Sequence, residues 1–104
     1  MQNDSEDRII QKYRENEEMM ILIYAQWCVN NGLDPKAIYK LAYPEQQIPS
    51  LLDDVMASTV SKNESEEIAS DVVIQLLQIY GNDDLAFVVQ AKVEEINKGT
   101  KRST

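Results

Sequence analysis

Histidine is absent from this chain of 104 residues, and the three glycines, Gly32, Gly81 and Gly99, lie far apart. Without histidine the chain lacks the commonest general base and metal ligand at neutral pH, which excludes Ser-His-Asp and Cys-His mechanisms. Isolated glycines also exclude the glycine-rich loops that hold phosphates in dinucleotide and P-loop sites. We therefore assign no catalytic, cofactor-binding or metal-binding residues and expect a protein that is not an enzyme.

Cysteine and long apolar runs are also scarce. A single cysteine, Cys28, cannot form an intramolecular disulfide, which is typical of a reducing compartment. The longest apolar stretch, residues 19–29, is shorter than the about 20 residues that a membrane helix needs. The first eight residues, MQNDSEDR, are acidic and do not resemble a secretory signal. We expect a cytoplasmic protein without a membrane segment.

Basic residues are outnumbered, with 10 Lys and Arg against 18 Asp and Glu, for a net charge of −8. Such a charge disfavours direct binding to nucleic-acid phosphates or anionic lipid, and it favours a basic protein as partner. The hydrophobic content of 43% is sufficient for one folded core. We expect a single domain over residues 1–98, followed by a flexible basic tail over residues 99–104.

What the sequence does contain is helical periodicity, beginning with a first helix over about residues 5–31. One side of this helix carries an apolar series in steps of three, four and seven, Ile9, Tyr13, Met20, Tyr24 and Trp27. In the stretch 19–29, ten of eleven residues are apolar and Gln26 alone is polar. Apolar residues around most of the circumference predict a central helix covered by its neighbours, with Trp27 and Cys28 in the core.

A short second helix is predicted after Gly32, which suits the left-handed position that ends a helix. Asp34 and Pro35 have the residue types of an N-cap and a first helical residue. The apolar side of this helix is predicted to contain Ile38 and Leu41. A proline on each side of the following segment prevents a long continuation.

A third, also short, helix is predicted from Ser50, because Ser50 and Asp53 have the spacing of a capping box. The polar segment 59–65 is then predicted to form the longest loop. Asn63 or Ser65 is the expected N-cap of the fourth helix.

A segment near the C-terminal end, residues 72–96, allows two interpretations. Valine and isoleucine at 72–74 favour a strand, and a β-hairpin turning at residues 81–84 is the alternative. The polar residues favour a helix, since they step by four, three and four: Asp71, Gln75, Gln78 and Asn82. We therefore predict an all-α bundle of about five helices, in which two long C-terminal helices form an αα-hairpin turning at Gly81.

Two tyrosines four residues apart, Tyr39 and Tyr43, precede a loop between two prolines. Together with Glu45 and Gln46 they form a candidate patch for contact with a partner. The alternative is that the two rings pack over the edge of the core and point their hydroxyl groups at water.

Acidic residues are dense in the segment 61–71, which holds four acids and one base. These residues form a candidate acidic face: Glu64, Glu66, Glu67 and Asp71. Rows of carboxylates can mimic the phosphates of a nucleic acid, although acids near helix starts are also favoured by the helix dipole alone.

These observations favour a non-catalytic protein that acts through protein–protein contact, as a regulator, adaptor or immunity-type binder. One alternative is an acidic nucleic-acid mimic that inhibits a DNA- or RNA-binding protein. Another is a structural homo-oligomer, such as a homodimer formed through the surplus apolar face of the first helix.

Overall fold

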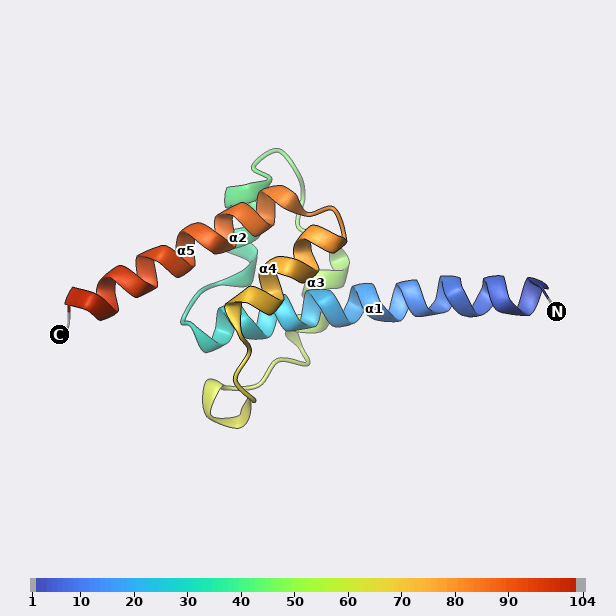
Figure 1. Cartoon of the computed structure of the whole chain (residues 1–104), viewed down its shortest axis with the longest axis horizontal. Coiled ribbons are helices and arrows are strands. Elements are labelled where there is room, and N and C mark those ends of the chain that lie inside the picture. The colour runs from blue at the N-terminus through green and yellow to red at the C-terminus, as the bar shows by residue number, and fades with distance from the viewer. Residues whose placement is uncertain (1, 103–104) are drawn as a thin grey trace.

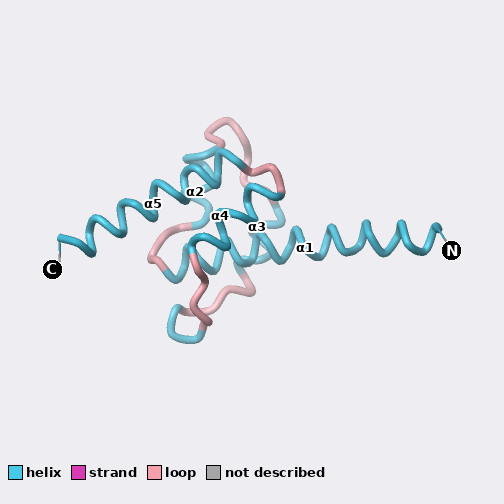
Figure 2. The backbone as a smooth tube through the Cα atoms, viewed as in Figure 1, coloured by secondary structure: helices cyan, strands magenta, loops and turns pink. Residues whose placement is uncertain are grey.

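Five α-helices and one short 3-10 helix make up most of residues 2–102 (Figure 1). The computed structural model describes the backbone of residues 2–102 and the side chains of residues 16–99. The α-helices are α1 (Gln2–Asn30), α2 (Pro35–Ala42), α3 (Ser50–Met56), α4 (Ser70–Ile79) and α5 (Asp83–Arg102), and the 3-10 helix is η1 (Lys62–Glu64). Figure 2 shows helices and loops without a strand over the described backbone. The all-α prediction is confirmed, and the hairpin alternative for residues 72–96 is wrong.

Helix α1 occupies the centre of the fold, where α2, α3 and α4 all pack against it. Met20, Tyr24 and Trp27 are buried along one side of α1, as the spacing predicted. The remaining members of that series, Ile9 and Tyr13, have side chains outside the described residues. The second half of α1 is therefore the central core helix.

The turn between α1 and α2 follows the local chemistry of the sequence. Gly32 has a φ of +70°, and the N–H of Leu33 donates to the carbonyl of Cys28 at 2.8 Å. Asp34 caps α2 by accepting a hydrogen bond from the backbone N–H of Lys36 at 3.0 Å. Pro35 follows as the first helical residue, so this predicted helix start is confirmed.

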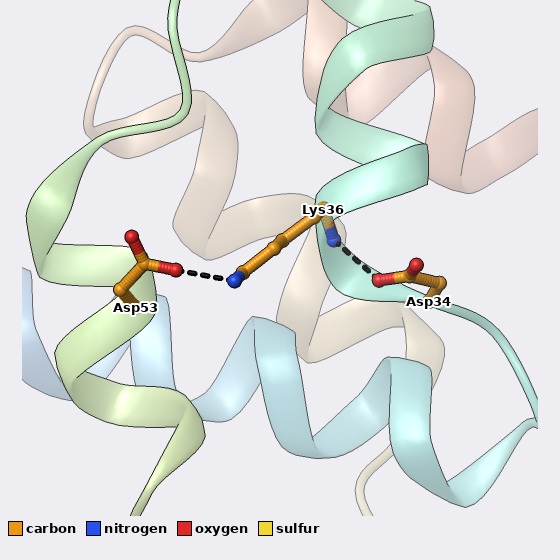
Figure 3. Close-up of polar contacts among 3 residues, drawn as sticks. All are labelled: Asp34, Lys36 and Asp53. Atoms are coloured by element: carbon orange, nitrogen blue, oxygen red, sulfur yellow. Dashed lines mark hydrogen bonds and ion pairs between the residues drawn. The ribbon is translucent and has the colours of Figure 1, made fainter.

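Lys36 also connects α2 to α3 (Figure 3). Its backbone N–H binds the carboxylate of Asp34, while its Nζ forms an ion pair with Asp53 on α3. This hydrogen-bonded contact with Asp53 raises the pKa of Lys36 above its usual value. Because all three side chains are exposed, the ion pair contributes little to stability.

Two details of the short helices differ from prediction. Leu41 is 59% exposed, and the buried side of α2 is made instead by Pro35, Ile38 and Tyr39. The reason is that α2 packs between α1 and α5, which selects the face containing Tyr39. In α3, Ser50 is the first helical residue after Pro49 and makes no capping bond, so the predicted capping box is wrong.

The start of α4 is a further correction. The helix begins at Ser70 after Ala69, not after Asn63 or Ser65, and residues 65–69 are not helical. The backbone is extended at Ser65 and Ala69, and the segment is anchored where Asn30 binds the Ser65 side chain and Ile68 packs against the core. Helix α4 is therefore only ten residues long.

Helices α4 and α5 form the predicted αα-hairpin. Gly81, with a φ of +77°, ends α4, and the N–H of Asn82 donates to the carbonyl of Leu77 at 2.7 Å. Val73 and Leu77 of α4 meet the core beside Leu85 and Val89 of α5. Three of the four residues of the predicted polar stripe are exposed and Asn82 is half-buried, in agreement with a helix.

Helix α5 continues to Arg102, so residues 99–102 of the predicted tail are helical. Residues 103–104 of the predicted tail lie outside the described residues.

Candidate functional site

A polar pocket of about 430 Å³ lies where the C-terminal end of α1 meets the segment that leads into α4. Its lining comes from two regions far apart in the sequence, the last turn of α1 and residues 62–70. The lining residues are Trp27, Asn30, Asn31, Lys62, Ser65, Glu66, Glu67, Ile68, Ala69 and Ser70.

Gln26, the lone polar residue of the apolar stretch, holds the loop beside this pocket. Its side chain is 8% exposed. The Gln26 Nε2 donates to the carbonyl of Val60 at 2.8 Å, and the N–H of Val60 donates back to Oε1 at 2.9 Å. Nε2 also donates to Oδ1 of Asn30 at 2.9 Å. The Gln26 side-chain amide therefore makes with Val60 the same pair of hydrogen bonds that a residue of a neighbouring β-strand would make.

The pocket wall is fixed by further side-chain hydrogen bonds. Trp27 Nε1 donates to the Ser70 hydroxyl at 3.0 Å, which supplies the acceptor that a buried indole requires. Asn30 Nδ2 donates to the Ser65 hydroxyl at 3.2 Å, and that hydroxyl donates to the Glu66 carbonyl at 2.7 Å. These roles of Ser65 and Ser70 were not predicted from the sequence, although an isolated Gln26 in an apolar run was a signal for such a network.

The fold brings only two of the four residues of the candidate acidic face to the pocket. Glu64, Glu66, Glu67 and Asp71 are all exposed, and Glu66 and Glu67 line the pocket. Lys62 lines the same pocket and interrupts the row of negative charge. Within the part of the chain that the structure describes, no group of three acidic or cysteine side chains is placed to bind a metal ion.

The candidate tyrosine patch lies against the core. Tyr39 is 9% exposed and its hydroxyl donates to Gln46 Oε1 at 3.0 Å. The ring centroids of Tyr39 and Tyr43 are 5.0 Å apart, and the Tyr43 hydroxyl donates to Asn82 Oδ1 at 3.4 Å. Partial burial raises the pKa of Tyr43 above its usual value. Glu45 and Gln46 are exposed beside the pair, whereas Tyr39 is buried and Tyr43 is half-buried.

Large apolar side chains are instead exposed elsewhere. Phe87 on α5 is 76% exposed and Ile79 on α4 is 74% exposed. Phe87 is the single phenylalanine of the chain. Phe87 lies two residues after the buried Leu85, about 200° around the helix and so on the side opposite the buried apolar series. This spacing could have predicted from the sequence that Phe87 is exposed.

Cys28 is predicted to be chemically inert in the native protein. It is buried, and burial raises the pKa of its thiol to about 12 despite a hydrogen bond with Tyr24 that lowers it. Since the thiolate is the reactive species, we expect native protein near pH 8 to react with a disulfide reagent at least about 100-fold more slowly than urea-unfolded protein. Release of the reagent's coloured thiolate measures both rates, and equal rates would contradict a buried thiol.

None of the helices has the combination of length and hydropathy needed to cross a membrane, judged over the described residues.

Comparison with known proteins places the chain in a family. The family model described as YxiS matches residues 1–94. A protein of Bacillus subtilis (strain 168), named "Uncharacterized protein YxiS", is 43% identical over 83 residues, which covers 79% of this chain and 86% of that protein. No solved structure matches the chain. With the family model spanning nearly all of the helical fold, the chain belongs to the YxiS family.

Proposed function

We propose that the protein is a non-catalytic cytoplasmic binding domain that acts through contact with another protein. The observation that carries this proposal is the exposure of Phe87 on α5. Exposed aromatic side chains supply much of the binding energy where proteins meet, because they bury a large apolar area at a small entropic cost. The lack of histidine and the buried, protonated Cys28 support a role that is not catalytic.

Phe87→Ala tests the proposal directly. Tagged wild-type protein is incubated with lysate of its own host, washed with rising salt, and the retained proteins are identified by mass spectrometry. An aromatic hot spot contributes about 2 kcal/mol or more, which is about thirtyfold in affinity. We expect Phe87→Ala to lose the retained partner while its melting temperature stays unchanged.

Val72→Ala is the matched control, because Val72 is also apolar and exposed but lies on α4. A partner retained equally by wild type and Phe87→Ala would contradict the proposed contact. Alanine at Tyr39 would be a poor test, since Tyr39 is buried and its loss would also destabilise the core.

A second candidate function, mimicry of nucleic acid by the acidic face, is favoured by the exposure of Glu64, Glu66, Glu67 and Asp71. A partner bound through these charges would leave at moderate salt, because salt screens exposed charges. Retention through high salt would contradict mimicry and agree with an apolar contact.

A further inference from the structure

The two longest helices project from the fold in opposite directions (Figures 1 and 2). We call residues 2–18 of α1 the N-terminal arm and residues 90–102 of α5 the C-terminal arm. The molecule is 60 Å long but only 33 Å and 23 Å in its other dimensions. Because the arms point away from each other, they cannot meet within one chain.

The apolar stripe of α1 continues into the N-terminal arm. Met20, Tyr24 and Trp27 of this stripe are buried in the core. The spacing of the sequence places Tyr13 and Ile9 on the same side of the helix, in the arm. Isolated helices of this length are marginal in water and gain most of their stability from packing an apolar face. The arm therefore has the pattern of a helix that packs against something outside its own chain.

The C-terminal arm repeats this arrangement at the other end of the molecule. Val89 is buried, Val93 is partly buried against the core and Ile96 is 36% exposed, in steps of four and three. The stripe thus becomes progressively more exposed as α5 leaves the fold.

The charges of the two arms are complementary. The N-terminal arm holds six acids and three bases, for a net charge of −3, whereas the C-terminal arm holds four bases and two acids, for +2. The acids are Asp4, Glu6, Asp7, Glu15, Glu17 and Glu18, and the bases of the C-terminal arm are Lys92, Lys98, Lys101 and Arg102. The outermost charges of the two arms are also opposite, since residues 4–7 hold three acids and residues 98–102 hold three bases. Arg8, next to residues 4–7, is the first base of the N-terminal arm.

A second copy of the chain can bring these arms together at both ends. In Figure 1 α1 and α5 both run from right to left along the chain. A twofold axis perpendicular to the long axis of the molecule produces a second copy whose helices run in the opposite direction. The N-terminal arm of each copy then lies antiparallel to the C-terminal arm of its partner, and one symmetry operation forms both contacts.

We propose that the protein is a twofold homodimer in which the N-terminal arm of each copy packs against the C-terminal arm of its partner. This inference does not depend on the proposed contact at Phe87.

Charge reversal tests the pairing of the arms in the full-length chain. One variant carries Asp4→Lys, Glu6→Lys and Asp7→Lys, and the other carries Lys98→Glu, Lys101→Glu and Arg102→Glu. Within either variant both arms have the same sign, so each alone is expected to raise the dimer Kd by about tenfold or more. An equimolar mixture restores opposite charges at both contacts and is expected to form a heterodimer.

Sedimentation equilibrium measures the mass, with twice the 11.9 kDa of one chain expected for the wild type. Glu64→Lys, Glu66→Lys and Glu67→Lys together form the matched control, which changes three exposed acids outside the arms and is expected to leave the dimer intact. A monomeric wild type at high concentration overturns the proposal, as does a dimer that both reversals leave unchanged. Failure of the mixture to dimerise also overturns it.

Circular dichroism establishes that each variant keeps the helical content of the wild type. If a reversed variant is unfolded, the salt dependence of the wild-type dimer provides the second measurement. The dimer Kd is expected to rise with salt, since salt screens the attraction between opposite charges. A Kd that does not change with salt overturns the electrostatic pairing.

Discussion

Replacing Trp27 with alanine is expected to lower the free energy of unfolding by about 3–5 kcal/mol. Trp27 is 1% exposed at the centre of the core, and its indole N–H binds the Ser70 hydroxyl at the start of α4. Alanine would leave a cavity at the centre of the core and remove the bond that joins α1 to α4. Small domains have about 5–15 kcal/mol in total, so the variant would lose a large share of its stability.

Urea unfolding followed by far-UV circular dichroism measures this effect. Tryptophan fluorescence cannot be used, because Trp27 is the single tryptophan of the chain. Ile79→Ala is the control, since Ile79 is largely exposed and its replacement should change stability by no more than about 0.5 kcal/mol. A loss below about 1 kcal/mol for Trp27→Ala would show that Trp27 does not anchor the core.

Gln26→Leu is expected to cost about 1–3 kcal/mol and to release the loop between α3 and α4. Leucine fits the surrounding apolar stretch but cannot bind Val60, whose N–H and carbonyl both pair with the Gln26 amide. The change would also remove the hydrogen bond from Gln26 to Asn30, which helps to position Asn30 for its own bond to Ser65. The change therefore separates the polar role of Gln26 from simple packing.

Hydrogen exchange at the Val60 amide is the direct readout. We expect this amide to exchange much faster in Gln26→Leu, while amides in the middle of α5 keep their protection in proportion to the global stability. Gln75→Leu, on the exposed face of α4, controls for the added apolar surface. An unchanged exchange rate at Val60 would mean that the Gln26 contact does not hold the loop.

The local parts of the fold could be predicted because they depend on neighbours within a few residues. The burial of Met20, Tyr24 and Trp27 followed from helical spacing, and the start of α2 followed from Asp34 and Pro35. The end of α4 followed from Gly81, whose left-handed conformation glycine adopts at no steric cost.

The candidate site could be predicted less well, because its contacts join distant parts of the chain. Gln26 binds Val60, 34 residues away, and Trp27 binds Ser70, 43 residues away. Neither partner is indicated by any local pattern. The same reason applies to the late start of α4, since residues 65–69 are not helical and Asn30 of α1 binds the Ser65 side chain.

The sequence by itself determined an all-α chain, the central position of the apolar helix and the surplus of negative charge, because periodicity and composition act residue by residue. Only the tertiary structure decided which side of α2 is buried, that Tyr39 belongs to the core while Phe87 is exposed, and that α1 and α5 project in opposite directions. Those features depend on how helices pack against one another, and a helical face has no assigned neighbour until the whole chain has folded.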